Sequence, residues 1–183
     1  MAEPFPYPDP QLEGDGFVLR PYLVEDVAPY AAAVTEPSTA RWLNNYATDD
    51  ALGDISNVEA ERASGRMLVL TIADADTDAY LGMIALIAQS HGTGELAYMV
   101  APEARGRNLA CLSLQALGDW AIAKLGLGRL QVQIDPENAA SHAVALRAGY
   151  QREGLLRSAF VLHGERKDCV IYSRLPSDPP PEQ

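Results

Sequence analysis

The chain has 183 residues, of which 48% are hydrophobic and 21% charged, so it is long enough to bury one substantial core. The formal net charge of −11 argues against a nucleic-acid partner, because neutralising phosphates requires clustered lysine and arginine. The same charge favours a cationic partner, such as an amine substrate, since the mean field attracts positive charge. An acidic composition also serves solubility alone, and this second interpretation stays open.

The sequence carries no signal for a membrane or for export. No apolar run approaches 18 residues, and the start, "MAEPFPYPDP", has neither a basic nor an apolar leader region. Cys111 and Cys169 lie in apolar patterns without a CxxC or Cys/His companion, which is typical of reduced, buried thiols. The three histidines are scattered without ligand spacing. We therefore expect a cytoplasmic protein with no membrane partner and no metal.

The first half of the chain predicts helices and then a β-meander. Turn-rich stretches, "DADTD" and "QSHGTG", separate the later strands, as in antiparallel hairpins. Gly65 ends the helix before the meander through its tolerance of a left-handed C-cap. The expected elements are a strand over 16–22, a helix from about 25 to 34, a short helix after Pro37 that carries Trp42, a helix over 56–64, and strands over 67–73, 79–87 and 94–101.

The second half predicts helices that alternate with strands. The helix over 109–125 is apolar nearly all round, so we expect it to pack centrally against the sheet. A strand over 129–134 precedes a helix over 138–149, with Asn138 as N-cap and Gly149 at the C-cap. Strands near 150–156 and 167–175 close the fold. The chain therefore predicts one α/β domain over 16–175, with a flexible arm at 1–15 and a disordered tail at 176–183.

The stretch "VAPEARGRNLA", Val100 to Ala110, joins an expected strand to the central helix and is suited to binding phosphate. The first helical N–H groups have no intrahelical partner, and the helix dipole adds positive charge there. Gly106 lets the backbone approach an anion, and Arg105 and Arg107 supply charged donors. The alternative is a simple turn with two solvated arginines. Because P-loop and GxGxxG patterns are absent, the favoured anion is the pyrophosphate of a cofactor.

Two longer stretches, "ELAYMVAPEARGRNLACLSLQALGDWAI" and "NAASHAVALRAGYQREG", resemble the GNAT-type N-acetyltransferases, in particular the RimJ/RimL-like branch that modifies ribosomal-protein N-termini. In that family's signature, [RQ]xxGx[GA], Arg105 and Ala110 match, and Asn108 stands in place of glycine. Asparagine tolerates unusual backbone angles better than most residues. "LRPYLVEDV" and "GERKDCVIYSRL" extend the resemblance over 17–175.

The resemblance implies a GNAT-like mixed, mostly antiparallel central sheet flanked by helices in a single domain, acetyl-CoA as cofactor, and a homodimer. The backbone of Met99, Val100 and Ala101 would run beside the pantetheine arm, and the Asn138 side chain would lie near the thioester. The pyrophosphate would be held by the backbone amides of Gly106, Arg107, Asn108, Leu109 and Ala110, with Arg105 beside them.

Acetyl transfer to an amine requires a neutral amine, a stabilised oxyanion and a proton for the thiolate. The resemblance suggests a backbone N–H near Met99 or Val100 for the oxyanion, and Glu95 as base, directly or through water; the alternative is a solvated glutamate. The family's usual acid, a tyrosine, is replaced by Ala145. Ser141 is the remaining catalytic candidate, although it also fits a small helix residue and the thiolate can leave unprotonated.

Trp42 falls where the family's early helices wall the acceptor site, and it also fits a core anchor. Neither cysteine is placed as an acyl carrier, so we expect direct transfer in a ternary complex from acetyl-CoA to a primary amine, either a small molecule or a protein N-terminus. The alternative is a non-catalytic acyl-CoA-binding module with a degenerate active site, which the missing tyrosine and Asn108 favour. A structural domain that binds no coenzyme A is the third interpretation.

Overall fold

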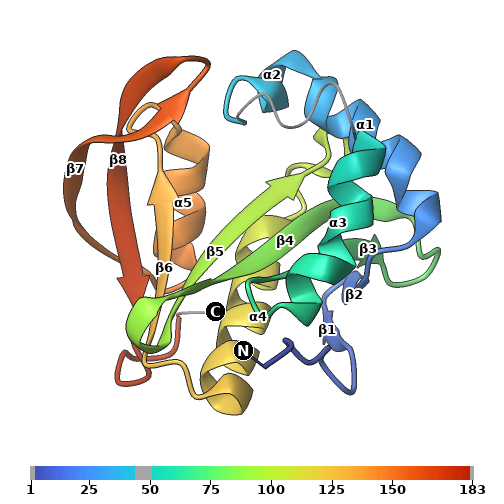
Figure 1. The fold of residues 1–183 in the computed structure, drawn as a ribbon, viewed down its shortest axis with the longest axis horizontal. Helices are drawn as coiled ribbons and strands as arrows, with labels where there is room; N and C mark the ends of the chain where they lie inside the picture. Colours follow the sequence, from blue (N-terminus) through green and yellow to red (C-terminus); the bar gives the residue numbers. More distant parts are fainter. Residues whose placement is uncertain (1–2, 44–50, 182–183) are drawn as a thin grey trace.

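The computed structural model describes residues 3–43 and 51–181, with the backbone alone for 51–56, and shows one mixed sheet with helices on both faces (Figure 1). The strand order is β1-β2-β3-β4-β5-β6-β8-β7. The strands are β1 (Leu12–Gly14), β2 (Phe17–Pro21), β3 (Met67–Asp74), β4 (Tyr80–Gln89), β5 (Thr93–Val100), β6 (Arg129–Ile134), β7 (Gln151–Leu162) and β8 (Glu165–Arg174). The helices are α1 (Val27–Thr35), α2 (Pro37–Ala40), α3 (Ala51–Ala63), α4 (Leu109–Leu125) and α5 (Ala139–Arg147).

The expected architecture, a mostly antiparallel sheet in one α/β domain, is confirmed. Within the described residues, β5 and β6 pair in parallel and every other neighbouring pair of strands is antiparallel. Helices α1 and α3 pack on one face, while α4 and α5 cover the other (Figure 1). The bounds of α4 and β6 agree with the sequence prediction at both ends.

Four local predictions differ from the structure. The helix α2 ends at Ala40, so Trp42 lies in the turn that follows rather than on a helix. The helix α3 begins at Ala51, earlier than expected, because the weak helix propensity of Gly53 hides its start. Strand β7 extends to Leu162, since pairing with β8 continues across two bulges that break its alternation.

The fourth difference is β1, which lies inside the segment expected to be a flexible arm. It pairs antiparallel with β2, and upstream the Phe5 N–H donates to the Arg62 carbonyl at 3.0 Å. Tyr7 adds a hydrogen bond to Glu59 and lies beneath the Arg62 guanidinium. Backbone pairing and these side-chain contacts hold this segment in place. Such contacts leave no periodic apolar pattern in the sequence, so the sequence alone did not predict them.

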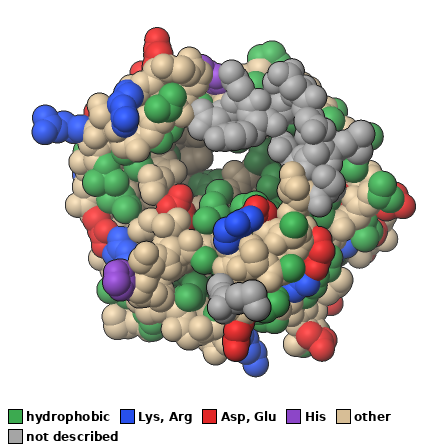
Figure 2. All heavy atoms as spheres, viewed as in Figure 1, with side chains coloured by type: hydrophobic (Ala, Val, Ile, Leu, Met, Phe, Trp, Pro, Cys, Tyr) green, Lys and Arg blue, Asp and Glu red, His purple; other side chains and the backbone are tan. Residues whose placement is uncertain are grey.

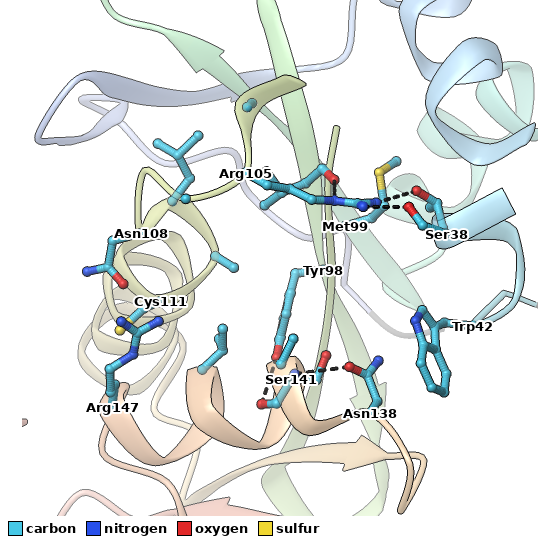
Figure 3. Close-up of a pocket in the computed structure, with 18 of the residues that line it drawn as sticks. Ser38, Trp42, Tyr98, Met99, Arg105, Asn108, Cys111, Asn138, Ser141 and Arg147 are labelled. Carbon is cyan, nitrogen blue, oxygen red and sulfur yellow. Dashed lines mark hydrogen bonds between the residues drawn. The ribbon is translucent and has the colours of Figure 1, made fainter. Parts of the chain in front are cut away.

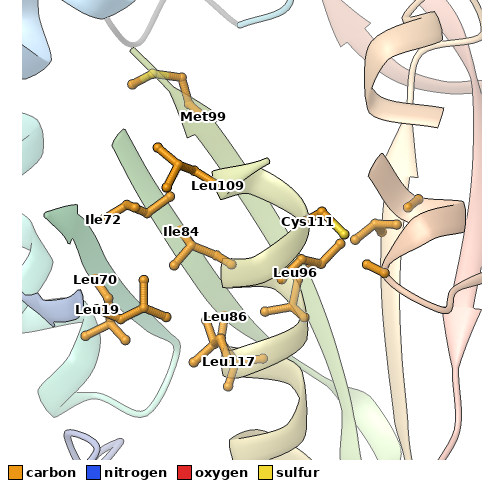
Figure 4. Close-up of a cluster of buried hydrophobic side chains, with 14 of the residues drawn as sticks. Leu19, Leu70, Ile72, Ile84, Leu86, Leu96, Met99, Leu109, Cys111 and Leu117 are labelled. Carbon is orange, nitrogen blue, oxygen red and sulfur yellow. The ribbon is translucent and has the colours of Figure 1, made fainter. Parts of the chain in front are cut away.

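The core lies between α4 and the sheet (Figure 4). Leu114, Leu117 and Ala121 of α4 are fully buried, which confirms the central packing that the apolar pattern predicted. They meet apolar strand residues such as Leu86 and Leu96. In the described part of the chain, no helix has both the length and the apolar character needed to cross a membrane.

A buried ion pair fixes the junction between β2 and the 3₁₀ turn Val24–Asp26 that leads into α1. Arg20 donates two hydrogen bonds to the Asp26 carboxylate, at 2.7 and 3.0 Å. Asp26 also accepts from the Leu23 N–H at 2.9 Å and from the Thr71 hydroxyl at 2.8 Å. Burial raises the pKa of Asp26, but these donors outweigh it and hold the pKa below its usual value.

Candidate active site

The two parallel strands of the sheet form a fork. Thr93–Glu95 of β5 pair with Arg129–Gln131 of β6, and no further pair joins the two strands although each continues. Beyond Glu95, β5 remains paired with β4 as far as Val100. The sheet is therefore open between the far ends of β5 and β6.

A cavity of about 440 Å³ lies at this opening. The face shown in Figure 2 is hollowed near its centre, and Figure 3 shows the lining side chains. The walls come from α2 and the turn after it, the end of β5, the start of α4, and one side of α5. The lining residues are Ser38, Thr39, Trp42, Leu43, Tyr98, Met99, Val100, Ala104, Arg105, Gly106, Asn108, Leu109, Ala110, Cys111, Asn138, Ala140, Ser141, Val144 and Arg147.

Ten of the sequence-predicted site residues are among these, and three are not: Glu95, Ala101 and Arg107. Ala101 is fully buried behind the end of β5, where its N–H donates to the Leu81 carbonyl at 2.8 Å. Glu95 lies at the base of the fork. Arg107 lies on the outer side of the loop at 101–108, called the cofactor loop because the sequence predicts that it binds the cofactor.

The loop before α4 adopts left-handed backbone angles at two positions. Gly106 has φ 82° and Asn108 has φ 60°, so asparagine does adopt the conformation that glycine supplies in the family signature. Asn108 is also the N-cap of α4, and its side chain makes no capping hydrogen bond. The N–H groups of Leu109 and Ala110, the first two residues of α4, therefore have no partner within the helix, and both residues border the cavity.

The two arginines of the loop have different partners. Arg105 reaches across the cavity mouth and donates to the hydroxyls of Ser38 and Thr39, both at 2.6 Å, and to the Val100 carbonyl at 3.4 Å (Figure 3). Arg107 instead pairs with Asp74 at 3.1 Å, on the opposite side of the loop. Arg105 thus links the cofactor loop to α2, while the charge of Arg107 is engaged away from the cavity.

Helix α5 presents a polar end to the cavity. The Asn138 side chain caps the helix by accepting from the Ser141 N–H at 3.1 Å, which confirms its predicted N-cap role. The Tyr98 hydroxyl, coming from β5, donates to the Ser141 carbonyl at 3.3 Å. Burial raises the pKa of Tyr98 to about 12, although the contact with Ser141 lowers it in part. Tyr98 is therefore neutral at physiological pH.

Glu95 is held by two neighbouring glutamines of β6. The Nε2 atoms of Gln131 and Gln133 both donate to Glu95 Oε2, at 2.9 and 2.8 Å. Both glutamines lie on one face of the sheet because they are two residues apart on the same strand. This arrangement fixes the carboxylate through Oε2 and leaves Oε1 without a described hydrogen bond.

Trp42 and Cys111 lie toward opposite ends of the cavity (Figure 3). The half-buried Trp42 ring stacks beneath the Arg41 guanidinium, with 4.4 Å between the guanidinium carbon and the ring centroid. Burial raises the pKa of the Cys111 thiol, and the charge of Arg147 offsets this only in part. A thiol held in its neutral form supports the packing role that the sequence favoured for Cys111.

Sequence reasoning missed several lining residues, of which Ser38, Thr39, Tyr98 and Arg147 carry polar groups. Arg147 belongs to a stripe on α5 with Ser141 and Val144, at helical spacings of three, so the periodicity of that helix could have revealed it. Tyr98 gives no comparable signal, because an aromatic residue within an apolar strand usually indicates core packing.

Comparison with known proteins identifies the family. The protein family described as "Acetyltransferase (GNAT) domain" matches this chain over residues 17–151. Among curated proteins, the uncharacterized N-acetyltransferase YoaA of Bacillus subtilis is 27% identical, over 90% of this chain and 96% of YoaA.

Two solved structures share the fold. Mycobacterium smegmatis RimJ, in complex with CoA-disulfide, has a TM-score of 0.77 and 22% identity, with 87% of this chain and 82% of that chain covered. RimL, a ribosomal L7/L12 alpha-N-protein acetyltransferase in complex with coenzyme A, has a TM-score of 0.79 and 20% identity, with 90% and 97% covered. Since the family match spans most of its length, the chain belongs to the GNAT acetyltransferase family.

Proposed function

We propose that this acetyltransferase moves the acetyl group of acetyl-CoA to a primary amine by direct transfer in a ternary complex. The observation that carries the proposal is the cavity at the fork between β5 and β6. One end of the cavity meets the N-terminus of α4, and the other meets Trp42. A donor that carries phosphates would thus approach the fork from the α4 end of the cavity. The acceptor would approach from the end that Trp42 lines.

The residues at the start of α4 fit the pyrophosphate of the donor. The backbone amides of 106–110 are directed by the left-handed conformations of Gly106 and Asn108, and the helix dipole favours an anion there. The backbone of Met99–Ala101 would run beside the pantetheine arm along the open edge of β5. Asn138 would border the thioester end, while its oxygen caps α5.

Strand alternation favours Val100 over Met99 as the oxyanion donor. The Ala101 N–H points to β4, since it donates to the Leu81 carbonyl. Polar groups of residues two apart on a strand point to the same edge, so the Met99 N–H also points to β4. The Val100 N–H points the other way, into the opening, where a preorganised donor stabilises developing negative charge.

Glu95 is the proposed general base. Its Oε1 is available to accept a proton while Oε2 is held by the two glutamines. Because Glu95 does not line the cavity, we propose that it takes the proton of the amine through a bridging water. Ser141, at the α5 end, is the proposed hydroxyl neighbour of the thiolate.

The acceptor class follows from the relatives and from charge. Similar structures include ribosomal-protein acetyltransferases, which supports a protein N-terminus as acceptor, and the net charge of −11 supports a cationic one. We also propose a cytoplasmic location, from the cysteine pattern of the sequence, and a homodimer, as the family resemblance implies. The second candidate, a non-catalytic acyl-CoA-binding module, is favoured by Ala145, which is fully buried where the family's acid would stand.

Turnover distinguishes the two candidates. Release of free thiol from acetyl-CoA should be followed with a panel of N-terminal peptides and small primary amines. An enzyme releases thiol only when an acceptor is present and yields an acetylated product by mass spectrometry. Saturable acetyl-CoA binding without acetylation of any amine in the panel would favour the binding module.

The arginines of the cofactor loop provide a matched pair of variants. Arg105→Ala is expected to weaken acetyl-CoA binding about tenfold, because Arg105 lines the cavity and offers charge-assisted hydrogen bonds. Arg107→Ala should change the affinity by less than about threefold, since Arg107 pairs with Asp74 outside the cavity. Titration calorimetry with acetyl-CoA measures both. Equal losses in the two variants would show that Arg107 turns toward the ligand on binding.

A further inference from the structure

We infer that Tyr98 donates a hydrogen bond from its hydroxyl to the sulfur that leaves in acetyl transfer. The inference rests on the proposed function and deepens it by naming the group on the thiolate side of the fork. Among the described residues that line the cavity, Tyr98 carries the one phenol.

The position of Tyr98 compensates for the missing tyrosine of α5. Its ring extends from β5 toward α5, and its hydroxyl lies 3.3 Å from the Ser141 carbonyl (Figure 3). Ala145 lies one helical turn beyond Ser141, and its small, fully buried side chain cannot reach into the cavity. The phenol that α5 lacks is thus supplied from the facing strand, close to the same helix.

Tyr98 and Glu95 lie on opposite faces of the sheet. They are three residues apart on β5, and side chains of a strand alternate between the two faces. Glu95 shares its face with Gln131 and Gln133, whereas Tyr98 faces α5. An amine that enters beside Glu95 would therefore attack from one side of the fork, and the sulfur would leave toward Tyr98 on the other.

The chemical step balances with these groups. The amine nitrogen forms a bond to the thioester carbonyl carbon, the carbon–sulfur bond then breaks, and its electron pair stays on sulfur. The proton of the amine passes to Glu95 through water and from there to solvent. Tyr98 turns its single O–H from the Ser141 carbonyl to the sulfur, keeps its own proton and stabilises the thiolate by a hydrogen bond. Its raised pKa, about 12, suits a donor that stays protonated throughout.

The test compares three variants in turnover and in the titration of bound coenzyme A. Tyr98→Phe removes only the hydroxyl, and Ser141→Ala removes the competing hydroxyl. Tyr150→Phe is the matched control, because Tyr150 is a buried tyrosine outside the cavity. The thiolate of bound coenzyme A is followed by its ultraviolet absorbance across pH. The absorbance of the acetyl-CoA complex at the same pH is subtracted, because it contains the contribution of the protein's own tyrosinates.

Tyr98→Phe is expected to lower kcat about 10- to 100-fold, the range for a hydrogen bond to a charged group, with the KM for acetyl-CoA within about twofold. It should also raise the pKa of the bound thiol by about one unit, while Tyr150→Phe changes neither quantity. If the pKa of the bound thiol is the same in Tyr98→Phe and the wild type, or if it rises in Ser141→Ala alone, the inference is wrong even where acetylation proceeds normally. If the wild type binds no coenzyme A, both the inference and the proposed function fail.

Discussion

Replacing Asp26 with alanine is expected to lower the free energy of unfolding by about 3–5 kcal/mol, the range found when one partner of a buried ion pair is removed. Asp26 is 2% exposed and Arg20 is 6% exposed, so the arginine would keep its charge in the core without its bidentate acceptor. The donors of Leu23 and Thr71 would lose their acceptor too. Chemical denaturation monitored by circular dichroism measures the change.

Asp78→Asn is the control for this prediction, because Asp78 has a left-handed backbone, with φ 59°, that asparagine tolerates better than alanine does. Asp78 also accepts from Arg20, at 2.6 Å, but its side chain is 61% exposed, so its loss should cost no more than about 1 kcal/mol. Equal losses for the two variants would contradict the assignment of the stabilisation to the buried pair.

The same pair predicts a pH dependence. The pKa of Asp26 in the folded protein lies below its ordinary value of 3.8, so the ionised carboxylate stabilises the fold above about that pH. This contribution disappears as the pH falls through the folded-state pKa. The wild type should therefore lose more stability than Asp26→Ala over that acidic interval.

Glu95→Gln is expected to reduce kcat about 10²- to 10⁴-fold, the usual range for loss of a general base, while the affinity for acetyl-CoA stays the same. The change is nearly isosteric, and Glu95 does not line the cavity, so the donor site should be intact. Steady-state kinetics and calorimetry with the same protein separate the two effects.

Glu13→Gln makes the same chemical change at an exposed position of β1 and should leave turnover unaffected. Should Glu95→Gln turn over at the wild-type rate, a different base would be required. Should it lose cofactor binding instead of turnover, Glu95 would have a role in the donor site rather than in proton transfer.

The fold was largely predictable because its central elements carry strong periodic signals. The continuous apolar pattern of α4 and the strict alternation of β6 fix both ends of each element. The errors fall where tertiary contacts override local signals. Strand β1 exists only by pairing with β2, and β7 continues past its bulges because β8 supplies the partner.

The candidate site was predictable in its backbone and less so in its side chains. The left-handed conformation at Asn108 follows from the signature and from the properties of asparagine. The direction of a long side chain does not follow from spacing, which is why Arg105 and Arg107 looked equivalent although they face different sides of the loop. The partners of Glu95 lie on β6, about 36 residues along the chain, and only the folded sheet brings them together.

The central claim is that the cavity at the start of α4 binds acetyl-CoA, and a calorimetric titration tests it most directly. The wild type is compared with Ala110→Glu, which introduces a like charge into the cavity wall, and with Ala123→Glu, which makes the same change on the exposed side of α4. We expect micromolar binding by the wild type and by Ala123→Glu, and affinity about 30-fold weaker in Ala110→Glu, from repulsion at close range. Absence of binding by the folded wild type at millimolar acetyl-CoA, or equal affinity in all three proteins, would contradict the claim.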